Sequence, residues 1–236
     1  MTSLENDNLL TVVVLVHQHD DRLRNCLNSL KQFPEVLKIE SESTITDFAA
    51  ARNKALAQVK TPWVFFVDSD EVVPEGSYEI IKKAIRDQEA DAFSVVRSDI
   101  FRGKKLKFAE WGRQQIVRLL QTKSIFFKGK VHEVPTGYKS QVLLPITIKH
   151  FAHQSVGEFL VSVERYAALR ATEIRSSKTR LILELITYPP GKFIWNMVFL
   201  LGFLDGWRGL IYATIMSYHS AMVRIFALGN LLQNEE

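Results

Sequence analysis

The sequence predicts an α/β fold, in which helices sandwich a mostly parallel sheet and a C-terminal α-helical hairpin follows. Residues 9–16 and 63–67 are continuous apolar runs rich in β-branched and aromatic side chains. Such runs are typical of strands that are buried on both faces of a parallel sheet. Segments with helical periodicity alternate with these runs, and this alternation favours a parallel sheet covered by helices.

The first hundred residues carry local signals for each element. Asp20 or Asp21 can cap a helix, because the apolar residues that follow recur at helical spacing. An alanine-rich segment, residues 47–59, predicts a helix that lies close to the sheet. In chain order we expect a strand at 9–16, a helix after Asp21, a strand at 36–39, a helix at 47–59, a strand at 63–67, a helix at 78–86 and a strand at 92–96.

Beyond residue 98 the periodicity is weaker. Residues 116–120, 124–127 and 143–148 are expected to be short strands, the first two of the mixed type often added to such sheets, and residues 158–174 an amphipathic helix. Three apolar segments follow, split by Tyr-Pro-Pro-Gly at 188–191 and by Asp-Gly-Trp-Arg-Gly at 205–209. We therefore divide the chain into a first domain, residues 1–155, and a C-terminal helical region, residues 156–236.

The apolar tail has more than one interpretation. Two helices with few charges and with aromatic residues near their ends, such as Trp195 and Trp207, are typical of a helical pair at a membrane surface. A hairpin that caps the core, or a homodimer interface formed by these helices, are the alternatives. No uncharged apolar segment reaches the roughly 18–20 residues that span a bilayer, and the polar start of the chain predicts no signal peptide.

Composition restricts the partners. The net charge is only +4, but residues 97–139 hold eleven Lys and Arg against three acids, which favours an anionic partner such as phosphates, nucleic acid or a membrane. Nucleic acid is disfavoured, because the stretch lacks a recognition-helix pattern and carboxylates at the strand ends would repel phosphates. The single cysteine, Cys26, excludes an internal disulfide and fits a reducing compartment.

Carboxylates follow the buried strand at 63–67 directly. Asp68 and Asp70 are one residue apart, so their side chains can point the same way. In open α/β sheets the ligand crevice lies outside the carboxyl ends of the strands. Hard oxygens at that place suit Mg²⁺ or Mn²⁺. The alternative is a solvated acidic turn before Pro74, and the placement after a buried strand favours the metal site.

Six segments in order carry a resemblance to a known family. They are residues 12–17, 35–44, 48–53 (Phe-Ala-Ala-Ala-Arg-Asn), 63–71 (Trp-Val-Phe-Phe-Val-Asp-Ser-Asp-Glu), 118–119 with 127–133 (Phe-Lys-Gly-Lys-Val-His-Glu), and 201–209 (Leu-Gly-Phe-Leu-Asp-Gly-Trp-Arg-Gly). Together they resemble family 2 glycosyltransferases, the inverting class with the Rossmann-like GT-A fold. The small bacterial members that build lipopolysaccharide core and related envelope glycans are the most similar.

The resemblance implies a nucleotide-diphospho-sugar donor, with a UDP-sugar favoured. Asp70 would coordinate the Mg²⁺ or Mn²⁺ that bridges the diphosphate, with Asp68 nearer the ribose or the metal. His17 and Glu40 would belong to the nucleotide pocket, and Arg52 would approach the donor phosphates. The chemical reason for the cation is the negative charge that develops on the leaving nucleoside diphosphate. For Arg52, a helix-surface salt bridge to Asp47 or Glu42 is an equal alternative.

The same resemblance assigns the acceptor side. Glu133 would be the general base that deprotonates the acceptor hydroxyl, and His132 would orient it or bind the acceptor. Arg118 and Trp111 are expected to contact the acceptor or a phosphate. His150 and His153 follow a strand end, and His153 is our choice as a further metal ligand. A histidine there is more often a hydrogen-bonded structural residue.

Two departures from the family pattern affect the nucleotide pocket. The usual Asp-Ser-Gly-Ser-Thr turn is Glu-Ser-Glu-Ser-Thr at residues 40–44. Few residues then separate it from the helix at 48–53, where the family has a further helix and strand, which leaves the base preference open. We expect an enzyme peripherally attached to the inner face of the cell membrane that glycosylates a glycolipid or envelope glycan. A catalytically weak scaffolding protein or a nucleotidyltransferase is the alternative.

Overall fold

The structure is a computed structural model that describes residues 9–16, 19–40, 47–112, 114–129, 133–151, 153 and 155–233. The chain forms two compact units. The first unit comprises Met1–Arg97 and Gln114–Phe151, and the second comprises Ser98–Arg113 and Ala152–Glu236. The second unit therefore includes a segment, Ser98–Arg113, that the sequence analysis assigned to the first domain.

One sheet connects most of the described strands, in the order β2-β1-β3-β7-β5-β10-β4, with β6 paired to β5. A separate two-stranded sheet joins β8 and β9. The strands are β1 (Leu10–Val16), β2 (Val36–Glu40), β3 (Trp63–Asp68), β4 (Glu71–Val72), β5 (Ala92–Phe101), β6 (Lys104–Lys105), β7 (Gln114–Gln121), β8 (Phe126–Lys128), β9 (Val134–Thr136) and β10 (Gln141–His150).

The four strands expected from the first hundred residues run in one direction. β1 pairs in parallel with β2 and with β3. β7 lies between β3 and β5 and is antiparallel to both, so β5 has the direction of β3. The predicted α/β class with a mostly parallel sheet between helices is confirmed, and the insertion of β7 is the feature that the alternation of elements did not indicate.

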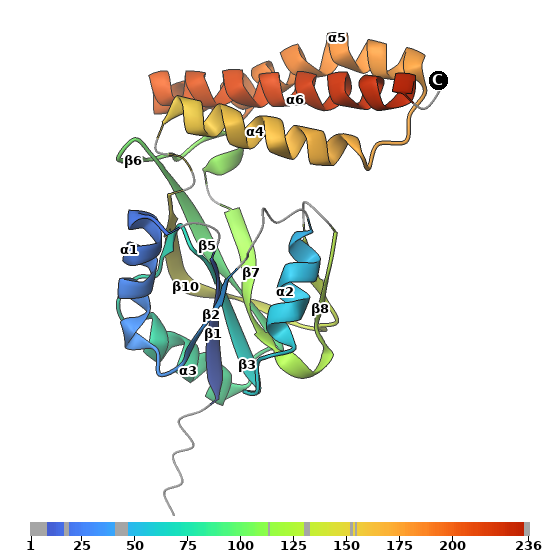
Figure 1. Ribbon diagram of the computed structural model, residues 1–236. Coiled ribbons are helices and arrows are strands. Elements are labelled where there is room, and N and C mark those ends of the chain that lie inside the picture. Colours follow the sequence, from blue (N-terminus) through green and yellow to red (C-terminus); the bar gives the residue numbers. More distant parts are fainter. Residues whose placement is uncertain are drawn as a thin grey trace, which may run out of the picture. The chain divides into compact units, whose positions relative to one another are not determined.

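Both faces of the central strands are buried, as their continuous apolar sequences predict. Val12, Val14 and Phe65 belong to one core cluster, and Val13 and Phe66 to the other. Helices α1 (Asp21–Ser29) and α3 (Ser77–Asp87) contribute to the first cluster, and α2 (Phe48–Leu56) contributes to the second (Figure 1). Ala49 and Ala55 are the side chains that α2 buries in this cluster, and side chains of this size let a helix lie close to a sheet.

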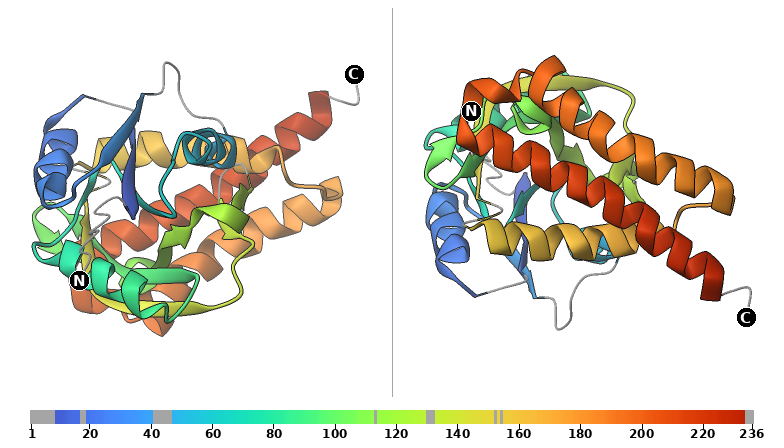
Figure 2. Two further views of the ribbon diagram at one scale, coloured as in Figure 1. Left: turned by 90° about the horizontal axis from the view of Figure 1, so that it is seen from below. Right: turned by 90° about the horizontal axis from the view of Figure 1, so that it is seen from above.

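The second unit is built on three helices, α4 (Val156–Ala171), α5 (Lys178–Ile194) and α6 (Trp207–Gln233). α6 packs against both α4 and α5 (Figure 2). Phe159, Tyr212 and Ile215 form the apolar contact of α4 with α6. In the part of the chain that the structure describes, none of the helices combines the length and the apolar character that a bilayer span requires.

The predicted interruption at residues 188–191 is wrong, because α5 continues through Pro189 and Pro190. Proline fixes φ near the helical value, so two prolines are compatible with helical backbone once the lost hydrogen bonds are offset elsewhere. α6 packs along α5 here, and Ser217 of α6 donates its hydroxyl to the Pro189 carbonyl at 2.7 Å, which ties the two helices together at this point.

The connection from α5 to α6 is a π-helical turn, Trp195–Phe199, followed by a 3₁₀ turn, Gly202–Asp205. Two glycines allow a very close backbone crossing there. A Cβ atom on Gly209 would lie 1.8 Å from the Gly202 carbonyl oxygen, and a Cβ on Gly202 would lie 2.5 Å from that of Asn196. The spacing of these glycines in the Gly-Phe-Leu-Asp-Gly-Trp-Arg-Gly segment is therefore a packing requirement.

Replacing Gly209 by alanine is expected to lower the free energy of unfolding by about 1–3 kcal/mol, because the added methyl group overlaps backbone atoms. Gly229→Ala in the same helix is the matched control. A Cβ on Gly229 meets nothing within 4 Å, so this change should stabilise by up to about 1 kcal/mol. Urea unfolding followed by circular dichroism measures both, and equal effects of the two substitutions would contradict the packing assignment.

Candidate active site

The carboxyl ends of β2, β1 and β3 meet at one edge of the first unit. The strand register places Glu40 opposite Val16, and Asp68 opposite Leu15. Glu40 contacts His19, whose Nε2 atom lies 3.1 Å from Glu40 Oε2, and both side chains are more than half exposed. This edge is where sheets of this type bind ligands.

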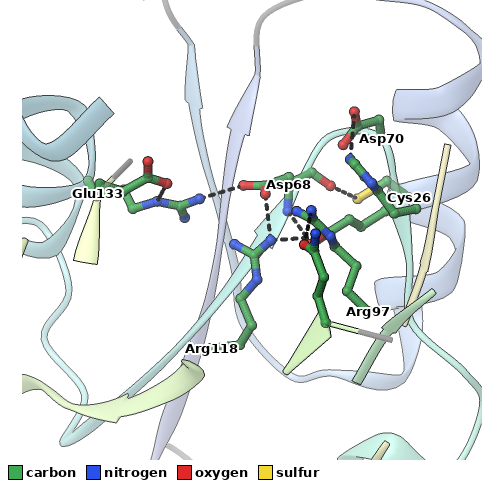
Figure 3. A network of polar contacts seen from close by, with 10 residues as sticks. Cys26, Asp68, Asp70, Arg97, Arg118 and Glu133 are labelled. Atoms are coloured by element: carbon green, nitrogen blue, oxygen red, sulfur yellow. Dashed lines mark hydrogen bonds and ion pairs between the residues drawn. The ribbon is translucent and has the colours of Figure 1, made fainter. Parts of the chain in front are cut away.

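Two buried arginines hold Asp68 (Figure 3). Arg52 Nη2 donates to Asp68 Oδ1 at 2.8 Å, and Arg118 Nη2 donates to Asp68 Oδ2 at 2.5 Å. Each arginine is only 5% exposed. Both oxygens of this carboxylate are therefore bonded to a cation, and charged hydrogen bonds of this kind are the strong ones.

Arg52 also connects Asp68 to Glu133, since its Nε atom donates to Glu133 Oε1 at 2.9 Å. The guanidinium lies over the rings of Phe66 and Phe127, at 5.2 and 5.7 Å from their centroids, which fixes its plane. The neighbouring Asn53 exchanges two hydrogen bonds with the backbone of Phe127, at 3.0 and 2.8 Å. The Ala-Arg-Asn segment of α2 thus binds the β8–β9 hairpin through Asn53, and Arg52 bridges the carboxylates of Glu133 and Asp68.

Glu71 supports Asp68 through two hydrogen bonds, one to its backbone and one to the arginine that it shares. Its side chain is fully buried, and it accepts from Arg118 Nη2 at 2.5 Å and from the Asp68 backbone N–H at 2.9 Å. The sequence analysis included Glu71 only as the last residue of the segment 63–71 and gave it no role. Its position in Asp-Ser-Asp-Glu was the available signal, and its burial could not be seen in the sequence.

Asp70 has a different environment from Asp68. His150 is paired with Glu71 in the short β4–β10 ladder, and the Phe151 N–H donates to the Asp70 carbonyl at 2.9 Å. This pairing brings His150 Nε2 to 3.4 Å from Asp70 Oδ2. The Asp70 side chain is 29% exposed and that of Asp68 is 26% exposed, so the two aspartates differ in their bonding partners and not in their exposure.

Residues 8–138 match the family model described as "Glycosyl transferase family 2". The chain belongs to this family. The predicted membership is confirmed, whereas the matching segment by itself does not separate the lipopolysaccharide-core members from others.

Among known proteins, the chain is similar to the SPbeta prophage-derived glycosyltransferase SunS of Bacillus subtilis (strain 168). The two are 26% identical over 151 residues, which cover 55% of this chain and 35% of SunS. SunS of Bacillus phage SPbeta matches with the same values. The chain thus spans about a third of the length of these relatives.

Among solved structures, S. aureus TarS 1-349 in complex with UDP-GlcNAc matches with a TM-score of 0.44 and 13% identity, covering 95% of this chain and 92% of that one. A longer TarS chain matches with a TM-score of 0.43 and 14% identity, covering 93% of this chain and 50% of that one.

The arginines decide the ionisation of the buried acids. Burial alone would raise the pKa of Asp68, but the charges of Arg118 and Arg52 outweigh it and hold the pKa well below its ordinary value. For Asp70, His150 likewise outweighs burial and lowers the pKa. For Glu71 burial prevails, and its pKa is raised. Asp68 and Asp70 therefore both stay ionised at neutral pH.

Cys26 of α1 lies close to the same acidic residues. Its thiol donates to the Asp68 carbonyl at 3.4 Å. Burial, and then the charges of Glu71, Asp68 and Asp70, raise its pKa to about 12. A thiol in this state is not a nucleophile, because the thiolate is the reactive form.

The donor atoms fit a cation that arrives with a diphosphate better than a permanently bound one. Among the described residues, no three His, Cys, Asp or Glu side chains are grouped to hold a metal. Both oxygens of Asp68 are bonded to arginines, which leaves Asp70 as the available carboxylate. Mg²⁺ is commonly held by one or two carboxylates together with substrate phosphates and water, so this arrangement is sufficient.

The remaining predicted residues have varied outcomes. His17 and His132 lie outside the described residues. Arg118, expected at the acceptor or a phosphate, is bonded to Asp68 and Glu71, and Arg52 is bonded to Asp68 and Glu133. Asp47, considered as a partner for Arg52, instead caps α2 by accepting from the Ala50 N–H at 2.8 Å.

Trp111 and His153 belong to the second unit, where they share an aromatic cluster with Phe159 and Tyr212. The His153 ring stacks on Phe159 and on Trp111, with centroid distances of 4.4 and 5.9 Å. His150 is the histidine that the structure brings to Asp70 within the first unit.

Replacing Arg118 by methionine is expected to cost about 3–5 kcal/mol of stability at pH 7, because Asp68 and Glu71 lose their shared cation while they stay buried. In the native protein the depressed pKa of Asp68 gives stability that is fully present above its unfolded value of about 3.9 and is lost as pH falls through the folded value. In the variant Asp68 keeps its bond to Arg52, whereas the buried Glu71 loses its arginine and its pKa rises further, so the deficit should shrink between pH 7 and pH 5 as Glu71 is protonated.

Urea unfolding at pH 7, 6 and 5 measures this change. Arg24→Met is the matched control, since the Arg24–Asp21 pair has side chains 76% and 78% exposed and should contribute less than about 0.5 kcal/mol. If Arg118→Met lost as little stability as the control, or if its loss did not depend on pH, the role of Arg118 as the cation of the buried acids would be wrong.

Proposed function

We propose that this chain transfers a sugar from a nucleotide-diphospho-sugar to a hydroxyl of a lipid-linked or envelope-glycan acceptor, with inversion and with the help of Mg²⁺ or Mn²⁺. A UDP-sugar is the first donor to test. The observation that carries the proposal is the network of the first unit, where Glu133 and Asp70 lie to either side of Asp68 (Figure 3). Membership in glycosyl transferase family 2 supports the reaction class.

Asp70 is the residue proposed to hold the cation, with diphosphate oxygens completing the coordination. When bound, the cation offsets the charge that develops on the leaving nucleoside diphosphate. Asp68 is proposed to act indirectly, by positioning Arg52 and Arg118, because its carboxylate is bonded to both arginines. Glu40, at the carboxyl end of β2, is proposed to contact the nucleoside together with His17.

Glu133 is the proposed general base. Inversion in one displacement requires a group that takes the proton from the acceptor hydroxyl as it attacks the anomeric carbon. Arg52 anchors one oxygen of Glu133, and the aromatic rings around Arg52 keep this anchor in place. A base held in this way does not need to be reoriented during the reaction. His132, its neighbour in the sequence, is proposed to orient it or to bind the acceptor.

One observation favours a second candidate function. α2 begins at Phe48, only eight residues after β2 ends at Glu40, and β2 is the outermost strand of the sheet order. The further helix and strand that the family pattern has in this region find no room in that connection. A reduced nucleotide pocket would suit a catalytically weak or inactive protein that acts through its other surfaces.

Donor binding is expected to require both a nucleotide-sugar and a divalent cation. In a thermal-shift panel of UDP-, GDP-, CMP- and dTDP-sugars with Mn²⁺ or EDTA, one donor should stabilise the protein by about 2.7 kcal/mol at a hundredfold excess over its Kd. Asp70→Asn should abolish the Mn²⁺-dependent part of this shift. Asp87→Asn, which changes an exposed acid paired with Lys83, should leave it unchanged.

No shift with any donor, in protein shown to be folded, would favour the inactive candidate. A shift that Asp70→Asn leaves intact would show that the cation is held elsewhere.

Glu133→Gln is expected to separate binding from chemistry. The amide keeps the shape of the side chain and can still accept from Arg52, so the donor-dependent thermal shift should persist. The transfer rate should fall by about 10²–10⁴-fold, which is the usual contribution of a general base. Transfer measured with the stabilising donor and a lipid-extract acceptor tests this, and an unchanged rate would remove Glu133 from the base role.

A further inference from the structure

The second unit exposes a cluster of large apolar side chains where α5 turns into α6. Trp195, Val198, Phe199, Phe203, Leu204 and Trp207 are between 46% and 66% exposed. We call the surface formed by these six residues the apolar cap. Contiguous exposed apolar surface of this kind is unusual in a free soluble protein and marks an interaction site.

The backbone of the apolar cap is ordered by its own hydrogen bonds. The N–H groups of residues 200, 201, 204 and 206 donate to carbonyls within the turn, at 2.9 to 3.3 Å. Beneath them the fully buried Asn196 accepts from the Glu110 N–H at 3.3 Å and donates to the Lys192 carbonyl at 3.0 Å. Because these donors are satisfied internally, the cap can enter a medium that offers no hydrogen bonds.

A basic segment is attached beside the apolar cap. Asp205 accepts from the backbone N–H groups of Lys107 and Phe108 at 3.1 and 2.9 Å, which fixes the segment that follows β6. Arg208 and Arg102 both lie over the Trp207 ring, at 4.4 and 5.6 Å from its centroid.

Residues 102–107 carry four exposed cations, which are Arg102, Lys104, Lys105 and Lys107. We call these four residues, together with Arg208, the basic rim. Two acids near the cap are already partnered: Asp205 accepts from backbone N–H groups, and Glu110 is paired with Lys192 at 2.5 Å. An apolar surface is thus bordered by cations.

We propose that the apolar cap and the basic rim together form the docking surface for an anionic lipid bilayer. Aromatic and aliphatic side chains would enter the boundary between head groups and acyl chains, while the lysines and arginines meet the lipid phosphates. The cap consists of short π-helical and 3₁₀ turns, which suits insertion at the interface. A lipid surface is favoured over a second copy of this chain, because symmetric pairing of two caps would bring their basic rims close to one another.

The proposal concerns the second unit alone and does not depend on the transfer reaction. It would account for access to a lipid-linked acceptor if the proposed function holds, and it stands or falls separately. Asp70→Asn should therefore bind vesicles like the native protein, whatever its effect on donor binding.

Co-sedimentation with vesicles tests the docking surface. The native protein should bind phosphatidylcholine vesicles that contain 30 mol% phosphatidylglycerol, and bind pure phosphatidylcholine much more weakly. Binding should weaken in 0.5 M salt, because ions screen the attraction. Phe199→Ser/Phe203→Ser should lower the partition coefficient at least tenfold, since burying a phenylalanine contributes about 1.5–3 kcal/mol. Both side chains are exposed, so the fold should persist, which thermal melting checks.

Lys104→Ala/Lys105→Ala tests the charge separately. About 1 kcal/mol per lysine near an anionic surface corresponds to roughly a 30-fold loss on the anionic vesicles and little change on neutral ones. The matched controls are Val161→Ser, which changes a 70% exposed residue of α4, and Lys31→Ala/Lys60→Ala, which removes two exposed lysines of the first unit. Both controls should bind like the native protein.

Three results would overturn the proposal. One is the absence of native binding to anionic vesicles. Another is equal binding by the Phe199→Ser/Phe203→Ser variant and the Val161→Ser control. The third is a concentration-dependent dimer in sedimentation velocity without lipid that the Phe199→Ser/Phe203→Ser change dissolves, since the occupant of the apolar cap would then be a second copy.

Discussion

The first unit depends on a single electrostatic requirement, which is that the buried carboxylates at the end of β3 must be compensated. An uncompensated buried carboxylate is costly, and removing one partner of a buried pair typically costs several kcal/mol. Arg118 from β7 and Arg52 from α2 meet this requirement for Asp68. Since Arg52 also bonds Glu133, the same interaction fixes the β8–β9 hairpin relative to β3. The arginines therefore organise the site before any ligand binds.

Much of the first unit could be predicted because its signals are local. Continuous apolar runs identified β1 and β3, and Asp20, one of the two expected caps, caps α1, the helix that follows β1. The insertion of β7 could not be predicted, since strand order depends on pairing between distant segments. Arg118 and Asp68 are 50 positions apart, so their contact leaves no local signal in the sequence. The family resemblance suggested that Arg118 contacts the acceptor or a phosphate, and it did not indicate that Arg118 binds Asp68 and Glu71.

The second unit shows the same limit of local signals. The segment at 202–209 was recognised as a sequence pattern, but the need for its residues comes from contacts. Its glycines allow a close backbone crossing, and Asp205 accepts from two backbone N–H groups that are 97 and 98 positions away in the chain. The break expected at Pro189 and Pro190 failed because packing of α5 on α6 overrides a local preference. Apolar character all round the tail was visible in the sequence. Which of those side chains stay exposed was not.

Asp68 and Asp70 illustrate how neighbours of the same residue type acquire different capacities. Arg52 and Arg118 bond three carboxylates between them, those of Asp68, Glu71 and Glu133, and Asp70 adds a fourth beside His150. The carboxylates outnumber the arginines bonded to them, and after burial the charges of Glu71, Asp68 and Asp70 add to the raised pKa of Cys26 in α1. A divalent cation would reduce this excess at Asp70 while Asp68 stays bonded. A diphosphate without a cation would instead meet repulsion, so donor and metal are expected to bind together.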